Sequence, residues 1–343
     1  MSSSAQFLSP SEAAKRLGVS AKALRLYEQR GLVAPIRTAA GWRAYGPGEM
    51  ARAAEIAALR TLGLSLAQVA RVLGGNPQDL EPSLAAHQER LEEQVRQTTG
   101  AIEKVRKLRA DLAQGQVPPV GELSGLSASV GLSIAFDLPW PWGGERFELR
   151  DIQPLTYITG PLGSGKTRLA QRLAETLPGA VFVGLERLEK GPVAQARVDA
   201  DPVLRSKVDR TLVWLSEDGA TISDPLISLL VEVEADGPSA LVVDMVEQGL
   251  DQATQEALMA HLRRRRLSKR PLFLLTRSCA ILDLTAVGLN ETILYCPANH
   301  SPPIRVAPYP GAPGYEAVET CVASPEVRAR TQGVVAWRPG VAR

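Results

Sequence analysis

The sequence of 343 residues contains few cysteines, few aromatic side chains and no long apolar run. Its three cysteines, Cys279, Cys296 and Cys321, are scattered and odd in number, which argues against a disulfide framework and predicts a reducing compartment. No run of roughly eighteen apolar residues occurs, so no membrane span is expected. The opening MSSSAQFLSPSEAAKR lacks the apolar core of a secretory signal. We therefore expect a cytoplasmic protein.

A strong excess of charge of one sign is also absent, because the net charge is only +2. The charges are nevertheless unevenly distributed. Residues 1–78 carry ten Lys and Arg against four Asp and Glu, a net charge of +6, so the remainder of the chain is −4. A basic head on a mildly acidic body predicts that a polyanion binds the head alone.

The length predicts two folded units and a connector. Residues 1–78 look like short helices broken by Gly and Pro, and residues 79–114 like one long helix. Residues 115–145 form a linker rich in Gly, Pro and Ser. Over residues 146–296 apolar runs alternate with helical patterns, as in an α/β layer structure. Residues 297–343 are a Pro- and Gly-rich extension to which we assign no role.

The head begins with signals for two helices separated by a tight turn. Ser9, Pro10 and Glu12 suit a helix N-terminus, Gly18 suits its end, and Ser20 suits the cap of the next helix. Helix, turn and helix present a second helix to the major groove. A two-stranded wing with a Gly turn is expected to follow. The residues predicted to contact DNA are Lys22, Arg25 and Tyr27 on the second helix and Arg37, Arg43 and Tyr45 on the wing.

The order and spacing of these residues resemble the winged helix-turn-helix of MerR-type transcription regulators over residues 7–74. The resemblance rests on GVS at 18–20, LRLYE at 24–28, GWRAY at 41–45 and LRTLGLSL at 59–66. It implies sequence-specific binding to double-stranded DNA. A winged helical domain that binds protein instead is the alternative.

Apolar residues on the long helix recur at spacings of seven, four and three, at Leu84, Leu91, Val95, Ile102, Val105 and Leu112. This heptad pattern predicts a helix that buries one seam against a partner. MerR-like proteins pair through such a helix in antiparallel fashion, so the resemblance implies a homodimer. Docking of the helix on its own chain is the alternative. Many relatives sense metals through cysteines near this helix, but none lies between Met1 and Ser278, so we expect no thiol-based sensing and no transition metal.

The run GPLGSGKT at 160–167 follows a β-prone segment and precedes a helical one, which is the setting of a phosphate-binding P-loop. Its glycines let backbone N–H groups surround a phosphate. Lys166 would neutralise the β- and γ-phosphates and Thr167 would ligate Mg²⁺. The predicted nucleotide-binding residues in the loop are Gly160, Gly163, Ser164, Gly165, Lys166 and Thr167.

A second apolar run ends in Asp244, a Walker B pattern whose carboxylate helps to hold Mg²⁺. The GLD at 249–251 and the strand at 272–277 then resemble ABC-type ATPases. Two positions depart from that family: Met245 replaces the Glu that orients the attacking water, and Arg277 replaces the switch His. The nearest candidate for the family's signature is LSEDG at 215–219. We therefore predict binding of ATP or another purine nucleotide with weak or absent hydrolysis, Glu247 being the candidate substitute for the missing carboxylate.

Two further sequence features are each open to two interpretations. Phe136, Trp140 and Trp142 lie upstream of the loop and would either stack on an adenine or pack in the core. The Arg263–Arg266 run sits on a predicted helix, where a solvated face is favoured over a second DNA site.

The sequence thus predicts a multidomain chain: a winged helix-turn-helix head, a dimerisation helix and an α/β P-loop NTPase-like domain. The predicted function is a dimeric transcription regulator modulated by a purine nucleotide with Mg²⁺. The alternatives are an ATPase or small-molecule kinase with an autoregulatory DNA-binding head, and a body that binds no nucleotide.

Overall fold

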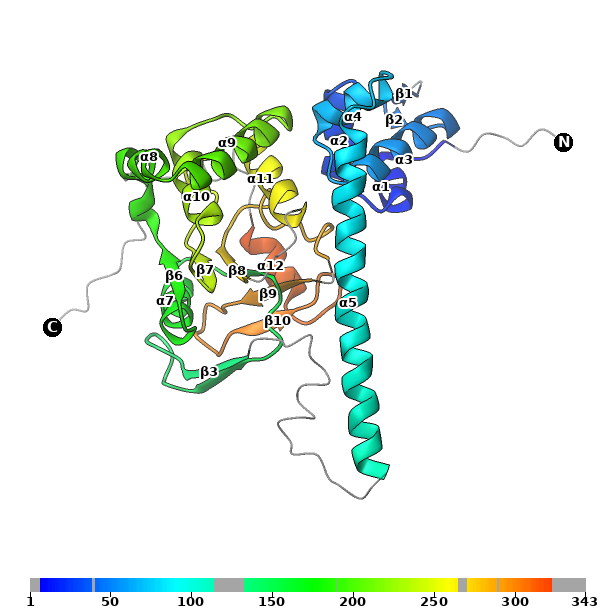
Figure 1. The fold of residues 1–343 in the computed structure, drawn as a ribbon. Helices are drawn as coiled ribbons and strands as arrows, with labels where there is room; N and C mark the ends of the chain where they lie inside the picture. Colours follow the sequence, from blue (N-terminus) through cyan, green and yellow to red (C-terminus); the bar gives the residue numbers. More distant parts are fainter. Residues whose placement is uncertain are drawn as a thin grey trace.

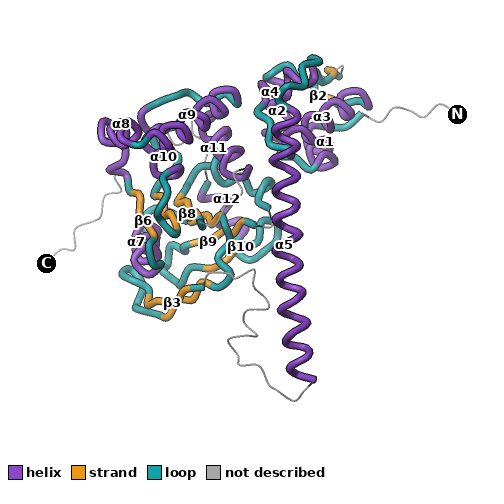
Figure 2. Tube along the Cα trace, viewed as in Figure 1, coloured by secondary structure: helices purple, strands orange, loops and turns teal. Residues whose placement is uncertain are grey.

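The computed structural model describes residues 7–38, 41–113, 133–189, 191–264, 270–288 and 290–322. A small helical head and an α/β body lie on either side of one end of a long helix (Figure 1). Helices dominate the head, whereas the strands gather in the body (Figure 2). This arrangement confirms the predicted multidomain fold class. No helix of the described residues is both long and apolar enough to cross a membrane.

The head is built from four short helices and a two-stranded wing. Ser9 and Glu12 form a capping box at the first helix, Gly18 ends that helix in the left-handed conformation, and the Ser20 hydroxyl accepts from the Ala23 N–H at 3.0 Å. The predicted start and stop signals are therefore confirmed. The elements are α1 (Pro10–Leu17), α2 (Ala21–Gln29), β1 (Ile36–Arg37), β2 (Arg43–Ala44), α3 (Pro47–Thr61) and α4 (Leu66–Leu73).

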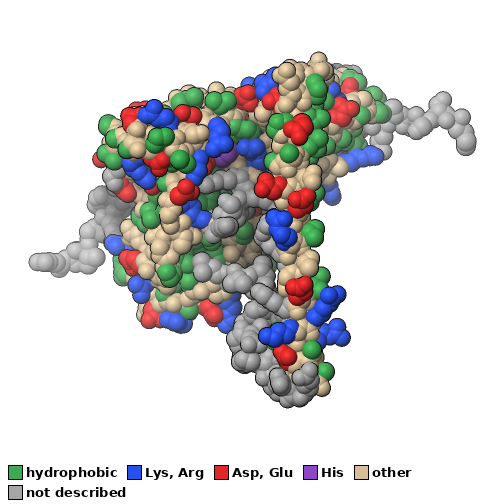
Figure 3. Space-filling model, viewed as in Figure 1, with side chains coloured by type: hydrophobic (Ala, Val, Ile, Leu, Met, Phe, Trp, Pro, Cys, Tyr) green, Lys and Arg blue, Asp and Glu red, His purple; other side chains and the backbone are tan. Residues whose placement is uncertain are grey.

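The long helix α5 (Leu80–Ala113) is continuous over 34 residues. Its six predicted seam residues are exposed by between 38% and 63% of their surface. In the space-filling view α5 extends well beyond the head, and apolar side chains alternate with charged ones along it (Figure 3). The apolar seam is thus not buried against the described part of the same chain.

The body is organised around a six-stranded sheet in the order β10-β9-β5-β8-β7-β6. Five strands are parallel, and only β10 pairs antiparallel with its neighbour. These strands are β5 (Leu155–Thr159), β6 (Ala180–Val183), β7 (Ala240–Val243), β8 (Leu272–Leu275), β9 (Glu291–Tyr295) and β10 (Ile304–Val306). β5, β7 and β8 are buried throughout, as parallel strands covered on both faces must be.

One face of the sheet packs against α7 (Lys166–Thr176) and against an antiparallel hairpin of β3 (Ile134–Asp137) and β4 (Arg146–Leu149). The other face is covered by apolar residues of most of the remaining helices. The remaining elements are η1 (Leu185–Leu188), α8 (Gly191–Ala200), α9 (Pro202–Glu217), α10 (Asp224–Glu234), α11 (Gln252–Arg264) and α12 (Tyr315–Cys321).

Two segments differ from the expected division of the chain. β3 lies in the expected 115–145 linker but packs on the body through Ile134 and Phe136. The extension after residue 296 supplies β10 and α12, and Val306 and Val318 enter the core. The alternation of Ile134, Phe136 and Leu138 is a strand signal, which the Gly-, Pro- and Ser-rich composition of 115–145 masked. Residues 323–343 lie outside the described residues.

The head is attached to the body by charged contacts between α3, α4 and the end of α9. Asp218, whose side chain is 1% exposed, pairs with Arg60 at 2.8 Å and accepts from the Leu66 N–H at 2.6 Å. Glu217 accepts from the Ser65 hydroxyl and pairs with Arg71 at 3.3 Å. The LSEDG run therefore provides the head's docking site at the end of α9.

A second part of the same interface surrounds Trp214. The Arg60 and Arg264 guanidiniums lie 5.3 Å and 4.8 Å from the centre of its ring, and Arg264 donates to the Gly63 carbonyl at 3.0 Å. The neighbouring Arg263 is tied to Glu291 and to the Tyr157 hydroxyl. The expectation of a solvated face is therefore wrong for Arg263, which is half-buried, whereas Arg264 is exposed even though it contacts the head. Arg265 and Arg266 lie outside the described residues.

We expect Asp218→Ala to weaken the association of head and body by roughly 3 kcal/mol, because it leaves Arg60 and the first turn of α4 without their buried acceptor. Glu217→Gln is the matched control, since Glu217 and Arg71 are more exposed and their pair should contribute about 1 kcal/mol or less. Chemical denaturation followed by circular dichroism would measure both. Equal denaturation midpoints for the two variants would contradict the assignment of Asp218 as the main contact between head and body.

Candidate DNA-binding surface and phosphate loop

Four cationic side chains predicted to contact DNA lie at the surface of the head. Arg25 on α2 and Arg37 on the wing are exposed, and Lys22 is half-buried. Arg43 on the wing pairs with Glu28 of α2 at 2.7 Å. This ion pair joins the second helix to the wing.

The two predicted tyrosines lie elsewhere. Tyr27 is 4% exposed and Tyr45 is 1% exposed, and both belong to the head core. Tyr27 follows Leu24 by three positions and so shares its inward face of α2. Tyr45 pairs its backbone with that of Leu8. The expectation that their rings face DNA is therefore corrected, since their burial makes them packing residues.

The structure also reveals features of this surface that the sequence analysis missed. Trp42 at the wing is 75% exposed. It belongs to the GWRAY motif but is not among the residues predicted to contact DNA. Lys22 donates from Nζ to the Cys279 carbonyl of the body at 2.6 Å. No local signal in the sequence predicts a contact between residues so far apart. One end of the second helix thus contacts the body.

The predicted phosphate loop lies between β5 and the N-terminus of α7, so the positive end of that helix faces the loop. Two of its glycines are required by space. A Cβ on Gly160 would lie 2.3 Å from the Cys296 carbonyl oxygen, and one on Gly165 would lie 2.6 Å from the Trp142 ring. Gly165 also has a φ of 88°, which disfavours other residues.

Lys166, Thr167 and Asp244 converge at this edge of the sheet. Lys166 Nζ donates to the Gly160 and Pro161 carbonyls at 2.8 and 2.7 Å. Thr167 Oγ1 donates to Asp244 Oδ2 at 3.1 Å. Burial lowers the pKa of Lys166 and raises the pKa of Asp244, the latter partly offset by the Thr167 hydrogen bond. A hydroxyl beside a carboxylate is the hard oxygen donor set that Mg²⁺ accepts.

The turn after Asp244 is held by a residue that sequence reasoning missed. Arg187 is 4% exposed and donates to the Asp244 and Met245 carbonyls at 2.8 and 2.7 Å. Met245 has a positive φ of 45°. Glu247 is buried and accepts from the Arg277 N–H at 3.0 Å. Arg187 carries no motif of its own, so only the fold brings it to this turn.

The three aromatic residues upstream of the loop divide into two groups. Phe136 and Trp142 are buried in the core beneath the β3–β4 hairpin. Trp140, in the same hairpin turn, is 66% exposed. Trp140 is therefore the one of these three residues that lies largely at the surface.

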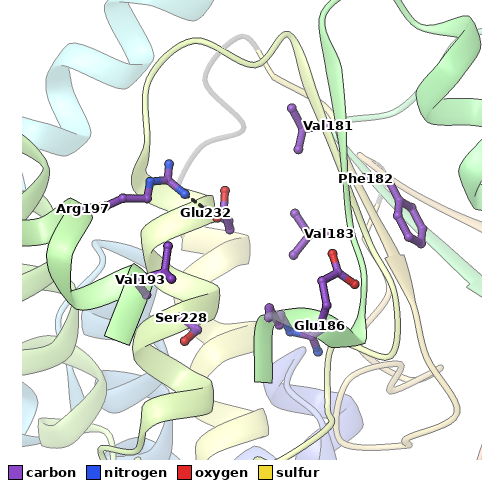
Figure 4. A pocket seen from close by; sticks show the side chains of 10 residues that line it. Val181, Phe182, Val183, Glu186, Val193, Arg197, Ser228 and Glu232 are labelled. Atoms are coloured by element: carbon purple, nitrogen blue, oxygen red, sulfur yellow. Dashed lines mark hydrogen bonds and ion pairs between the residues drawn. The ribbon is translucent and has the colours of Figure 1, made fainter. Parts of the chain in front are cut away.

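A cavity of about 210 Å³ lies beside the edge strand β6 and shares Arg187 with this site (Figure 4). Val181 and Val183 form one wall, and the Arg197–Glu232 ion pair crosses the opposite side. Because ligand pockets usually span about 300–1,000 Å³, this cavity is too small for a whole nucleotide.

Comparison with known proteins separates the two ends of the chain. The model of the MerR HTH family regulatory proteins matches residues 8–75. A probable heavy metal-dependent transcriptional regulator of Haemophilus influenzae is 34% identical over 116 residues, which make up 32% of this chain and 90% of that protein. The chain belongs to the MerR family. It is a MerR-type transcription regulator with an additional α/β body.

Other MerR relatives are matched over a smaller share of their length. The nodulation protein NolA of Bradyrhizobium diazoefficiens is 37% identical over 101 residues, 29% of this chain and 42% of NolA. Among solved structures, HiNmlR, a MerR family regulator lacking the sensor domain and bound to promoter DNA, is similar over 33% of this chain and 93% of its own, with 22% identity and a TM-score of 0.25.

Solved structures similar to a larger part of the chain include an ATP-binding cassette of an ABC transporter. It covers 59% of this chain and 100% of its own, with 14% identity and a TM-score of 0.35. For the described residues, no cluster of three or more His, Cys, Asp or Glu has the arrangement of a metal site.

For the MerR head, we expect Arg25→Ala to weaken binding to a duplex promoter fragment and to lower the slope of log affinity against log salt by about 1, because one phosphate contact is lost. Arg172→Ala, an exposed arginine on α7 of the body, is the matched control and should leave the slope unchanged. Fluorescence anisotropy across a salt series measures both. The same salt slope for both variants would count against this surface.

Proposed function

We propose that this MerR-type regulator binds double-stranded DNA as a homodimer in the cytoplasm. We further propose that MgATP, or another purine nucleotide with Mg²⁺, changes its affinity for DNA. The proposal of nucleotide binding rests on one observation, the hydrogen bond between Thr167 and Asp244 beside Lys166. This arrangement supports phosphate binding by the 160–167 loop and Mg²⁺ binding by Thr167 and Asp244. Trp140 is the proposed stacking partner for the base.

The residues around Asp244 favour a sensing role over rapid turnover. The thioether side chain of Met245 cannot accept a proton from an attacking water. The Glu247 carboxylate already accepts the Arg277 N–H. Since positioning and charge stabilisation supply most of phosphoryl-transfer catalysis, we expect hydrolysis to be slow. A steady-state ATP turnover assay distinguishes a sensor from the alternative, an ATPase or kinase with a DNA-binding head.

The proposed homodimer rests on α5. Its exposed seam of Leu84, Leu91, Val95, Ile102, Val105 and Leu112 offers apolar surface along nearly the whole helix. A second copy of the same helix, packed antiparallel, would bury this seam and space the two heads for a two-fold DNA site.

Val95→Glu combined with Ile102→Glu should convert the dimer to a monomer, because both charges would be buried in the seam. Ala110→Glu is the control, since Ala110 is exposed and lies off the seam. Analytical ultracentrifugation measures the mass of each variant. A dimeric double variant would exclude α5 as the pairing element.

Lys166→Ala should keep DNA binding but abolish its dependence on MgATP, because the charge that neutralises the β- and γ-phosphates is lost. Arg168→Ala, an exposed neighbour on α7, should respond to MgATP as the unmodified protein does. DNA titrations with and without MgATP provide the measurement. If Lys166→Ala retains the full response, the P-loop is not the sensor.

A further inference from the structure

The strand order places Arg277 between the two halves of the candidate nucleotide site. β8 pairs in parallel with β5, which leads into the phosphate loop, and with β7, which leads to Asp244. The residues after β8 therefore emerge at the same edge as Lys166 and Asp244. The Thr276 N–H donates to the Ile158 carbonyl at 3.0 Å, which holds the end of β8 against β5.

Among the described residues, the Arg277 side chain has no hydrogen-bonding partner. Its backbone N–H is held by Glu247, yet within the described ranges its guanidinium makes no hydrogen bond or ion pair, and its Nε atom is fully buried. Its positive charge also contributes, after burial, to the lowered pKa of Lys166. A buried guanidinium atom without an acceptor is costly, so an anionic partner at this place would stabilise it.

The two residues that follow lead directly to the DNA-binding head. Ser278 is fully buried and its hydroxyl donates to Gln255 of α11 at 2.6 Å. The next carbonyl, that of Cys279, accepts Lys22 Nζ from α2. Two residues span at most about 7 Å, so the candidate phosphate site and the second helix of the head are linked by one short turn.

The other end of α2 also lies against the body. A Cβ on Gly219 would come within 1.9 Å of the Arg30 guanidinium, which follows α2 directly. A duplex that receives α2 in its major groove must surround the exposed face of that helix. The Arg30 end borders Asp218 and stays with the docked head, whereas the contact of Lys22 with the body occupies surface that the duplex must reach.

We propose that the Arg277 guanidinium binds the terminal phosphate of the bound nucleotide. The turn 277–279 then shifts and breaks the hydrogen bond between Lys22 and the Cys279 carbonyl, so that α2 is free to bind DNA. This inference rests on the proposed nucleotide-binding function. It makes the ligand class a nucleoside triphosphate, because the β-phosphate of a diphosphate is already held by the loop. The contacts of Asp218 with Arg60 and α4 lie away from this turn and keep the head attached.

The test compares a non-hydrolysable ATP analogue with ADP, both with Mg²⁺, on the full chain and on Arg277→Gln. For the unmodified protein, DNA binding should be tighter with the triphosphate by roughly 5- to 150-fold, the usual range of coupling between sites. Arg277→Gln should bind a fluorescent ATP analogue, yet its DNA affinity should be the same with either nucleotide within about twofold.

The release of Lys22 can also be measured in the absence of DNA, by the extent of its acylation as determined by mass spectrometry. The triphosphate should increase labelling of Lys22 in the unmodified protein but not in Arg277→Gln. The exposed Lys15 of α1 is the internal control and should not change. Arg277→Lys, which keeps the charge, serves as the second variant should Arg277→Gln fail to fold, and it should show a reduced but measurable response.

The outcomes separate the two proposals. If the unmodified protein binds no nucleotide, both the proposed function and this inference fail. If nucleotide binds and changes DNA affinity, but Arg277→Gln and Arg277→Lys respond as the unmodified protein does, only the role of Arg277 is overturned. If Lys22 labelling does not depend on nucleotide, the link through the turn is overturned.

Discussion

The parallel pairing of β8 between β5 and β7 is the constraint on which the candidate nucleotide site depends. Because the carboxyl ends of parallel strands meet at one edge, this order brings the phosphate loop, Arg277 and Asp244 together. All three strands are buried along their whole length, so the edge that carries these residues belongs to the core of the body.

The uneven charge of the chain has a structural counterpart at the interface between head and body. A basic head meets acidic side chains at the end of α9, where Asp218 and Glu217 replace solvent as partners of Arg60 and Arg71. The buried Asp218 contacts give this interface specificity, whereas the exposed pairs add little energy. The same positive charge that suits DNA thus also docks the head on its own body.

Much of the architecture could be predicted from the sequence because its signals are contiguous. Capping residues, the phosphate loop and the heptad pattern of α5 are each contained within a short stretch, and the structure confirms the elements that they predict. Tyr27 and Tyr45 were misassigned because residue type favours DNA contact while the helix face and the strand pairing bury them.

The features that could not be predicted all depend on partners distant in sequence. Arg187 contacts Asp244 only because β6 and β7 are adjacent. Arg263 of α11 has its partners on the strands β5 and β9. The Lys22 contact with Cys279 joins residues separated by 257 positions and uses a backbone carbonyl, for which no residue type is diagnostic. Periodicity cannot report such contacts, since it describes only which face of an element is apolar.

The modest strength of these interdomain contacts bears on how a nucleotide could act. A ligand can shift an equilibrium only by the difference between its affinities for the two states. A head held by many buried ion pairs would need a difference that a single phosphate contact cannot supply. Here one lysine–carbonyl hydrogen bond opposes release of the Lys22 end of α2, while the contacts of Asp218 with Arg60 and α4 keep the head attached. Breaking one such hydrogen bond lies within reach of one guanidinium–phosphate interaction, and by reciprocity DNA bound to the freed α2 would tighten binding of the proposed nucleotide by the same factor.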